Sequence, residues 1–275
     1  MKKQGKKRIA FFAFIIIICT ICIGITISIE MNNYYEKEID NGEELKNNEL
    51  YNLDQELFKS KFINSFNNNI IGESNNIKKI DANKNIIYSN TIKEKVEDRY
   101  DLNTNIPYIN IENEDIQKYN DEIKNIFETK IGEIKSSNEN SIYTVDYMAN
   151  INNNILSLVI KATLKEGENS QRLILKTYNY NLDKNKEVEL EELISDKDLK
   201  TKEVENKLRE EIEKQNKESL ELQKLGYNVF IRNVTDDIFD IKNINTFFID
   251  SEGYIYIIYA YGNNNLTTEM DIVVF

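Results

Sequence analysis

The longest uninterrupted apolar segment of the chain lies close to its N-terminus. Ile9 to Ile29 contains 21 residues without a charged side chain. At a rise of about 1.5 Å per residue, about 20 apolar residues in a helix cross the hydrocarbon core of a bilayer. The segment therefore predicts a single transmembrane helix.

The charges on either side of this segment predict its orientation. Acidic residues follow it from Glu30 onward, and five basic residues precede it: Lys2, Lys3, Lys6, Lys7 and Arg8. By the positive-inside rule, residues 1–8 form a cytoplasmic tail and the C-terminal part of the chain lies outside the cell membrane. A cleaved secretory signal is the alternative, although such signals usually have a shorter apolar region that ends in small residues.

Residues 30–83 are polar and rich in asparagine, a composition typical of a flexible tether. Within this range, apolar side chains at helical spacing predict one short amphipathic helix, and they are Leu50, Leu53, Leu57, Phe58 and Phe62. This helix either belongs to the tether or lies on the membrane surface. The acidic residues beside it disfavour the second position on an anionic bilayer.

Residues 84–180 are predicted to form a first α+β unit. Residues 106–111 alternate loosely between apolar and polar positions and contain the single proline, Pro107, so they are expected to form an edge strand. The next apolar positions recur every three or four residues, as in an amphipathic helix, and they are Ile116, Tyr119, Ile123, Ile126, Phe127, Ile131 and Ile134. Asn113 is expected to cap the N-terminus of this helix.

Three strands are expected after this helix, because residues 142–148, 155–164 and 172–180 are rich in β-branched and aromatic side chains. The connections between them contain asparagine or glycine, which is typical of hairpin turns. Strands joined by hairpins are antiparallel, so we expect an antiparallel sheet.

Residues 181–275 are predicted to form a second α+β unit. A narrow apolar stripe at 199–212 lies in a highly charged segment and predicts a second amphipathic helix, which ends near Gly226. Three further strands are expected, at 245–249, 254–261 and 270–275, and a hairpin turn joins the first two. The predicted fold class is therefore α+β, with antiparallel sheets and two amphipathic helices preceded by a single transmembrane helix.

The composition excludes several kinds of chemistry. The chain has no histidine, so it has neither a Ser-His-Asp triad nor a histidine-ligated metal, and we expect no cofactor. Its two cysteines, Cys19 and Cys22, form a C-x-x-C pattern inside the apolar segment, where burial disfavours the reactive thiolate. They are therefore expected to be ordinary residues of the transmembrane helix.

The charge of the chain restricts its partners. Apart from the five basic residues of the tail, 30 basic and 47 acidic residues remain, which is a net charge of −17. A surface this acidic repels the phosphates of nucleic acids, so no nucleic-acid partner is expected. It also repels anionic polymers unless a basic patch or bound cations intervene.

One acidic segment is a candidate calcium site. Asp183, Asn185 and Glu187 place oxygen atoms at alternate positions, as the first residues of a calcium loop do. Val188 stands where such a loop needs glycine, and Ile194 stands where it needs glutamate. We therefore expect a simple turn.

A second acidic cluster contains Asp236, Asp237 and Asp240. These side chains could bind calcium or act as acids, but acidic residues most often occupy solvated turns and helix caps. A catalytic pair of carboxylates, as glycoside hydrolases use, cannot be chosen from sequence among 47 acidic residues.

Tyrosines supply the candidate binding surface. Four of them lie on or beside one predicted strand: Tyr254, Tyr256, Tyr259 and Tyr261. Tyrosine suits a binding surface because it offers a large ring and a hydroxyl group. The alternative is ordinary packing within the sheet, where tyrosine is common. An acidic surface that bears tyrosines favours a cationic protein over an anionic glycan as partner.

Parts of residues 85–275 resemble two domain families found outside the membrane of Gram-positive bacteria. Residues 106–109 and the following helix with Ile116 and Tyr119 resemble the start of the DUF4163 domain. Residues 178–194 resemble the entry of the DUF3298 domain, and residues 246–261 resemble its closing hairpin.

The resemblance implies an envelope-facing binding or sensing module. Some members of these families form the sensing ectodomain of RsiV-type anti-sigma factors, which respond to lysozyme, and others accompany polysaccharide deacetylase domains. The eight residues before the apolar segment are too few for a sigma-factor-binding domain, and a deacetylase would need histidines. The expected partner is a cationic envelope protein or a cell-wall glycan. The alternatives are an enzyme that acts on wall polymers through carboxylates, and a structural or assembly protein whose membrane helix pairs with others.

Overall fold

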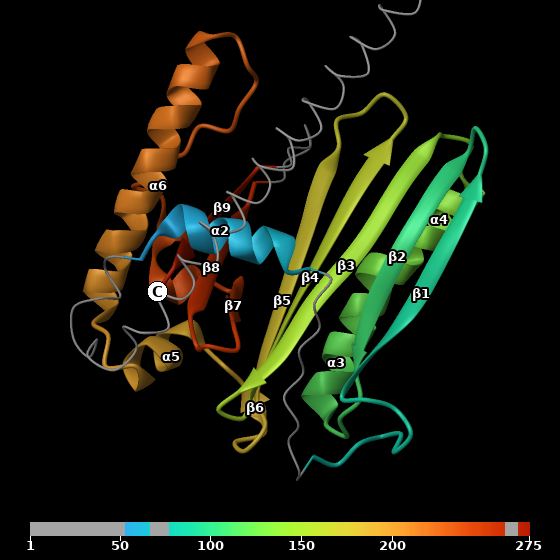
Figure 1. The fold of residues 1–275 in the computed structure, drawn as a ribbon, viewed down its shortest axis with the longest axis horizontal. Coiled ribbons are helices and arrows are strands. Elements are labelled where there is room, and N and C mark those ends of the chain that lie inside the picture. The colour runs from blue at the N-terminus through green and yellow to red at the C-terminus, as the bar shows by residue number, and fades with distance from the viewer. Residues whose placement is uncertain (1–52, 67–76, 262–268) are drawn as a thin grey trace, which may run out of the picture. The chain divides into compact units, whose positions relative to one another are not determined.

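The computed structural model describes residues 53–66, 77–261 and 269–275 (Figure 1). These residues belong to one compact unit, Leu53–Phe275, and a separate unit, Met1–Asn52, lies outside the described residues. The expected transmembrane helix, Ile9 to Ile29, and the basic residues before it belong to that second unit. Among the described helices, none is long and apolar enough to span a bilayer.

A six-stranded sheet lies at the centre of the described fold, and its strands follow one another in sequence order. The strands are β1 (Ile87–Val96), β2 (Tyr100–Ile109), β3 (Ser141–Asn152), β4 (Ile155–Glu166), β5 (Arg172–Asn181) and β6 (Lys186–Glu187). The antiparallel arrangement predicted for the three strands after the first helix is confirmed, since β4 pairs antiparallel with both β3 and β5.

β2 and β3 pair in parallel, and here the expectation of purely antiparallel sheets is wrong. The register places Tyr100 beside Ser141 and Thr104 beside Val145. The chain between the two strands is long and helical, and such a connection returns the chain to the end of the sheet at which β2 began. The apolar pattern of each strand fits either direction, so the connection decides it.

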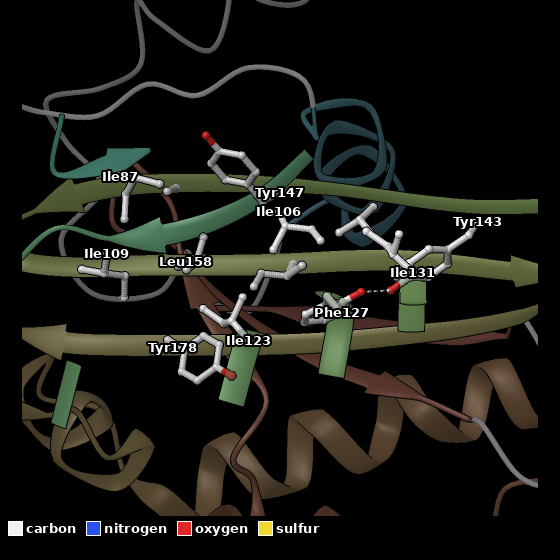
Figure 2. Packing of buried hydrophobic residues seen from close by; sticks show 14 of the residues in the cluster. Ile87, Ile106, Ile109, Ile123, Phe127, Ile131, Tyr143, Tyr147, Leu158 and Tyr178 are labelled. Atoms are coloured by element: carbon white, nitrogen blue, oxygen red, sulfur yellow. Dashed lines mark hydrogen bonds between the residues drawn. The ribbon is translucent and has the colours of Figure 1, made fainter. Parts of the chain in front are cut away.

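The connection between β2 and β3 is the first predicted helix. It consists of α3 (Glu114–Ile123), a π-helical stretch (Lys124–Glu128) and α4 (Thr129–Ser136). Asn113 caps it as expected, because its side chain accepts hydrogen bonds from the backbone N–H groups of Asp115 and Ile116. The Tyr143 hydroxyl donates to the Phe127 carbonyl at 3.5 Å, which ties the π-helical stretch to β3 (Figure 2).

The first core lies between this helical connection and one face of the large sheet (Figure 2). The helices contribute most of the apolar positions that helical spacing predicts, namely Ile116, Ile123, Phe127, Ile131 and Ile134. The strands contribute alternate residues, because successive side chains of a strand point to opposite faces of its sheet. On β4 these are Leu156, Leu158, Ile160, Ala162 and Leu164, whereas Val159 belongs to a second core on the other face.

The C-terminal part of the chain forms a second, three-stranded antiparallel sheet after two helices. The helices are α5 (Leu190–Asp196) and α6 (Thr201–Lys224), and the strands are β7 (Phe247–Ile249), β8 (Ile255–Ala260) and β9 (Met270–Val274). The three expected strands and the turn between the first two are confirmed. The second predicted helix ends as expected before Gly226, which has a φ of +89°.

α2 (Gln55–Asn64) is the short helix expected around Phe58, and its surroundings differ from the prediction. Phe58, Phe62 and Phe66 are buried in the second core together with residues of β4, β8 and β9. Because this apolar face is covered by protein, α2 belongs to the folded unit, which begins at Leu53, and not to a flexible tether or a membrane-surface helix. The expected Leu50 of this helix lies outside the described residues.

Side chains of the large sheet join it to β7. One edge of β7 pairs with β8, and the backbone N–H and carbonyl groups of Phe247 and Ile249 point away from β8 toward the large sheet. Each of these four groups is hydrogen-bonded by one polar side chain at 2.6 to 3.2 Å, and the side chains are Asn150, Ser157, Thr177 and Asn179. β7 therefore has partners along both edges although it pairs with only one strand.

Candidate functional site

A cleft of about 290 Å³ lies where α2, the end of β3 and the β7–β8 hairpin meet. Its apolar lining consists of Phe62, Met148, Ala149, Phe248 and Tyr256. Its polar lining consists of Lys61, Ser65, Asn150, Asp250, Ser251 and Glu252. Apolar walls with a few polar groups are typical of binding sites, and the volume is near their lower limit of about 300 Å³. The cleft therefore suits one side chain or another small group.

Asp250 organises the turn at the polar end of the cleft. Its Oδ1 accepts hydrogen bonds from the backbone N–H groups of Glu252 at 2.9 Å and Tyr254 at 3.0 Å. Its Oδ2 accepts a hydrogen bond from the Tyr256 hydroxyl at 3.1 Å. Burial raises the pKa of the Asp250 carboxyl above its usual value, although these hydrogen bonds act in the opposite direction.

Lys61 of α2 and Glu252 of the hairpin form an ion pair across the cleft, with 3.0 Å between Nζ and Oε1. Burial lowers the pKa of Lys61, but Glu252 and the nearby charge of Asp250 outweigh this effect, so the pKa lies above its usual value. The ammonium group also lies 5.9 Å from the centre of the Phe58 ring. Lys61 therefore stays charged and connects α2 to the hairpin.

Asn150 provides an acceptor without a partner. The residue is 5% exposed, and its Nδ2 donates to the Ile249 carbonyl at 2.6 Å. Its Oδ1 is buried and has no hydrogen-bond partner among the described residues. Nearly all buried polar atoms in folded proteins are hydrogen-bonded, so this oxygen is an exception, and because the atom itself is buried a molecule in the cleft does not reach it.

The four tyrosines of the predicted binding surface are divided between the two faces of the small sheet. Tyr254 and Tyr256 face α2, where their rings contact Phe58 with centroids 4.7 and 6.2 Å apart. Tyr259 and Tyr261 face the opposite side, where they contact Phe239 and Phe230. Only Tyr256 lines the cleft.

Two of these tyrosines are core residues. Tyr256 is 2% exposed and Tyr261 is 7% exposed, and both hydroxyls donate to carboxylates of their own chain. The structure thus does not present the four rings as one accessible surface. The physical reason is that side chains along residues 254–261 alternate between the two faces of the small sheet, and both of these faces are covered by other parts of the fold.

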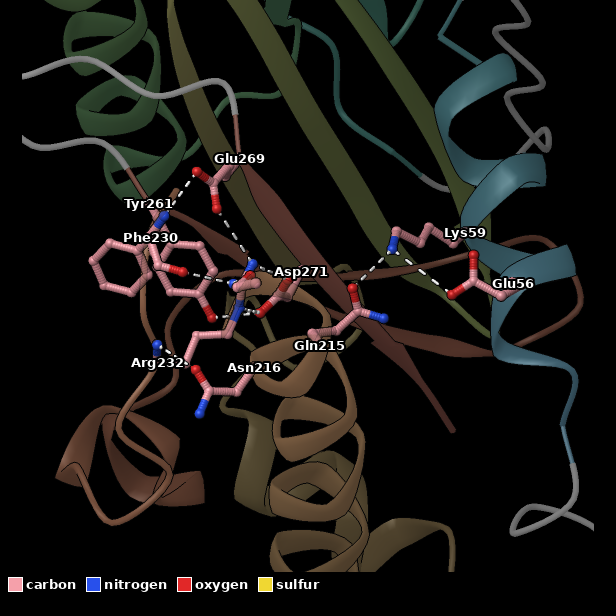
Figure 3. Close-up of polar contacts among 10 residues, drawn as sticks. Glu56, Lys59, Gln215, Asn216, Phe230, Arg232, Tyr261, Glu269 and Asp271 are labelled. Atoms are coloured by element: carbon pink, nitrogen blue, oxygen red, sulfur yellow. Dashed lines mark hydrogen bonds and ion pairs between the residues drawn. The ribbon is translucent and has the colours of Figure 1, made fainter. Parts of the chain in front are cut away.

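The far face of the small sheet holds a buried ion pair (Figure 3). Arg232 is bidentate to Asp271, with Nε and Nη2 at 2.5 and 2.8 Å from the two carboxylate oxygens. The Tyr261 hydroxyl donates to Asp271 at 2.7 Å, and the guanidinium lies 4.9 Å from the Tyr261 ring centre. Asn216 and Ser219 of α6 complete the cluster. Every charged group here has a partner, so the cluster stabilises the fold and is not a free site.

The acidic segments considered as metal sites form turns. Asp237 begins a 3₁₀ turn, and Asp240 accepts a hydrogen bond from Arg209 at 2.5 Å. Asp183 and Asn185 lie in the tight connection between β5 and β6. Within residues 53–66, 77–261 and 269–275, no group of three or more acidic or cysteine side chains is placed to hold a metal ion.

The cleft itself was not visible in the sequence. Its polar groups come from α2, β3 and the β7–β8 hairpin, which are about 100 residues apart in succession. The hairpin signal at 250–253 located Asp250 and Glu252 correctly in a turn. Lys61 and Asn150 carried no local signal, because only the packing of α2 and β7 onto the large sheet brings them near that turn.

Comparison with known proteins gives several similar chains among the solved structures, two of which are described below. No family model and no curated protein matches the chain. A DUF3298 family protein from Pseudomonas aeruginosa PAO1 is similar at 9% identity and a TM-score of 0.28, over 38% of this chain. This chain spans 55% of that protein. A member of the DUF3298 family from Bacteroides fragilis is similar at 12% identity and a TM-score of 0.30, over 63% of this chain and 82% of that one.

Both neighbours carry the name of a family that the sequence resembles. The likeness to the DUF4163 domain and to RsiV-type ectodomains stays a prediction.

Proposed function

We propose that this chain is a membrane-anchored, extracytoplasmic binding or sensing module of the bacterial cell envelope, and that it is not an enzyme. The cleft between α2 and the β7–β8 hairpin is the proposed recognition site. The observation that carries the proposal is the cleft itself, in which apolar walls of α2, β3 and β7 meet a polar turn that bears Asp250 and Glu252.

The acidic groups of the cleft favour binding over catalysis. Asp250 and Glu252 lie two residues apart in one turn, and the first uses both its oxygens to hold that turn. Glu252 is paired with Lys61. Glycoside hydrolysis needs two carboxylates on opposite sides of the scissile bond, with one free to donate a proton. Neither carboxylate is placed to do this, so the arrangement supports binding over hydrolysis.

The location and the partner follow from the sequence. The apolar segment from Ile9 to Ile29 anchors the chain, and the basic residues before it keep the N-terminus in the cytoplasm. The net charge of −17 on the remaining chain attracts cationic proteins and repels anionic polymers. A cationic envelope protein is therefore the preferred partner, and a wall glycan is the second.

One observation favours the enzymatic alternative. The pKa of Asp250 is raised by burial, as it is in carboxyl groups that act as general acids. In that case the cleft would bind a glycan of the cell wall and Asp250 would protonate the leaving oxygen. Release of sugar or peptide fragments from the wall is the result that distinguishes this function from binding.

The test uses the full chain in detergent micelles. Binding is measured to lysozyme, as a defined cationic protein, and to purified peptidoglycan, while soluble fragments are measured in parallel. Saturable binding that weakens with salt, without fragment release, supports the proposal. Fragment release supports the enzymatic alternative, and absence of both binding and release contradicts both functions.

A matched pair of variants tests the place of binding. Ser251 lines the cleft and is exposed, so Ser251→Tyr fills the opening without altering the core. Ser60→Tyr adds the same ring to an exposed position of α2 outside the cleft lining. We expect the first variant to weaken binding and the second to leave it unchanged. Equal behaviour of the two variants contradicts the assignment of the cleft.

A further inference from the structure

The end of α6 and the loop that follows it expose apolar side chains to solvent. Leu225 is 75% exposed and Tyr227 is 62% exposed, the two largest fractions of any large apolar side chain among the described residues. Leu222, on the last turn of α6, is 42% exposed, and no residue from Leu225 to Ile231 is charged. We call Leu222, Leu225 and Tyr227 the apolar tip. Figure 1 shows this end of α6 projecting beyond the small sheet.

The backbone fixes the start of this loop. Gly226 has a φ of +89°, and its N–H donates to the Gln223 carbonyl at 2.9 Å. The Tyr227 N–H donates to the Leu222 carbonyl at 3.1 Å. These two hydrogen bonds form a Schellman motif, which ends the helix in a defined turn. The apolar tip is therefore held in one arrangement at the end of α6.

The return of the loop is fixed as well (Figure 3). The Phe230 ring stacks on Tyr261 with centroids 4.3 Å apart, and its N–H donates to Glu269 at 2.8 Å. The Arg232 N–H donates to Asn216 of α6 at 2.9 Å. Because both ends of the loop are bonded to the rest of the fold, the apolar side chains between them stay exposed without folding back onto a core.

The charges near the apolar tip are balanced. The last three turns of α6 carry three acidic and three basic residues, namely Glu213, Glu218, Glu221, Lys214, Lys217 and Lys224. The chain after the N-terminal tail has a net charge of −17, so this end differs from most of the surface. A bilayer with anionic lipids repels the acidic surface but does not repel this end.

The sequence keeps the folded unit close to a bilayer. Residues 30–52 join the apolar segment to Leu53, and a chain of these 23 residues spans at most about 80 Å. Exposed apolar patches mark sites of contact with proteins or membranes. Tyrosine and leucine without neighbouring charges suit the boundary between headgroups and acyl chains, where tyrosine is enriched. A bilayer is therefore the partner that these residues fit.

We propose that the apolar tip docks onto the lipid bilayer in which the N-terminal segment is anchored. The three side chains enter the boundary between headgroups and acyl chains by about 5–10 Å. The loop goes no deeper, because its backbone N–H and carbonyl groups need water or headgroups as partners. This inference rests on the membrane anchoring in the proposed function and adds a second membrane contact, made by residues that do not line the cleft.

Tryptophan fluorescence tests the docking. The chain contains no tryptophan, so a single introduced one reports only on its own surroundings. Tyr227→Trp is compared with Ile80→Trp, a 56% exposed position before β1. Each full-length variant is reconstituted in phosphatidylcholine vesicles with or without bromine on the acyl chains, and flotation measures whether the chain stays with the vesicles. We expect the Tyr227→Trp emission to shift to shorter wavelength and to be quenched by brominated lipid, and the Ile80→Trp emission to show neither effect.

A second pair of variants tests the contribution of the tip. Leu225→Ser, combined with Tyr227→Trp, should lower the ratio of docked to undocked protein by at least about tenfold, because it removes one apolar side chain from the lipid contact. The loss is measured as loss of quenching. The control is Ile142→Ser, also combined with Tyr227→Trp, since Ile142 is 50% exposed on β3 and is not part of the tip. It should leave the quenching unchanged.

The outcomes separate this inference from the proposed function. Lipid quenching of Tyr227→Trp alone, with loss on Leu225→Ser, supports the docking. Quenching of both tryptophan variants or of neither overturns it, and the second result includes a tip covered by a protein or by a second copy of the chain. If the chain does not float with the vesicles, the membrane anchoring in the proposed function is wrong as well. If docking fails while lysozyme or peptidoglycan still binds, the inference is wrong and the recognition function stands.

Discussion

Gln55 and Val274 are 219 positions apart in the sequence and hydrogen-bond each other twice. The Gln55 side chain donates from Nε2 to the Val274 carbonyl at 3.0 Å, and its Oε1 accepts from the Val274 N–H at 2.8 Å. The side-chain amide thus gives the outer edge of β9 the contacts that a neighbouring strand would give. The pair fixes the start of α2 beside the small sheet, where Phe58 and Phe62 are buried.

Replacing this amide should loosen α2. Gln55→Leu removes both hydrogen bonds and leaves two backbone groups of Val274 without them, so we expect a loss of about 1–3 kcal/mol in the free energy of unfolding. Urea unfolding of the full chain measures it. Glu56→Gln, at an exposed neighbouring position, should change the free energy by less than about 0.5 kcal/mol. Equal stability of Gln55→Leu and the natural chain would show that α2 is held by its apolar side chains alone.

The polar side chains that hold β7 should be among the most sensitive positions of the large sheet. Asn179 donates to the Phe247 carbonyl at 2.8 Å and accepts from the Ser157 hydroxyl at 2.5 Å. Asn179→Leu leaves both groups buried without this partner, and we expect a loss of about 2–4 kcal/mol in the free energy of unfolding. Asn103→Leu on exposed surface of β2 is the control, and a comparable loss in both variants contradicts the role of Asn179.

The buried ion pair should respond differently to single and double substitution. Asp271→Asn leaves the Arg232 guanidinium, whose side chain is 4% exposed, without its bidentate carboxylate, and we expect a loss of about 3–5 kcal/mol. Glu269 stays 3.6 Å from the guanidinium and compensates part of the charge. The double variant Arg232→Met with Asp271→Leu should regain much of the loss, because no buried charge is left. Urea unfolding measures the double variant and its two single variants, Arg232→Met and Asp271→Leu. A loss in the double variant equal to the sum of the two single losses would contradict this coupling.

The titration of Asp250 should make stability decrease with rising pH. Burial raises the pKa of its carboxyl above the usual 3.8, with Glu252 adding to the shift and Lys197 lying nearby as a compensating charge. The folded state therefore binds the proton more tightly than the unfolded state, and the stability contributed by protonated Asp250 is present below pH 3.8 and lost as the pH rises through the folded pKa.

Asp250→Asn tests this dependence. The amide keeps an acceptor for the turn and does not titrate, so the free energy of unfolding should decrease less with rising pH than in the natural chain. Urea unfolding between about pH 3 and about pH 7 measures the two profiles, a range that covers the titration of a raised carboxyl. Parallel profiles would mean that Asp250 does not contribute to the pH dependence.

Local pattern was sufficient for most elements of the fold. The helix between β2 and β3, its cap at Asn113 and the strands β3 to β5 followed from spacing and side-chain type, because each buries one regular face. The direction of β3 relative to β2 did not follow. Pairing direction depends on the path of the connection, and the apolar pattern of a strand is the same in both directions.

The division of the tyrosines was contained in the sequence. Tyr254 and Tyr256 are separated by an even number of positions, and so are Tyr259 and Tyr261, but the step from Tyr256 to Tyr259 is odd. Residues at an odd separation on a strand lie on opposite faces. The partners of these tyrosines did not follow in the same way, because Phe58 and Phe230 come from segments whose packing only the structure shows.

The side chains along β7 also bear on association between copies of the protein. The end strand of a sheet can recruit a strand of another chain, because its outer backbone groups are free to pair, and this is a common route to aggregation. At Phe247 and Ile249 those groups are already bonded to Asn150, Ser157, Thr177 and Asn179. A foreign strand could pair with these four groups only by displacing a side chain from each of them, so this edge resists recruitment while the fold is intact.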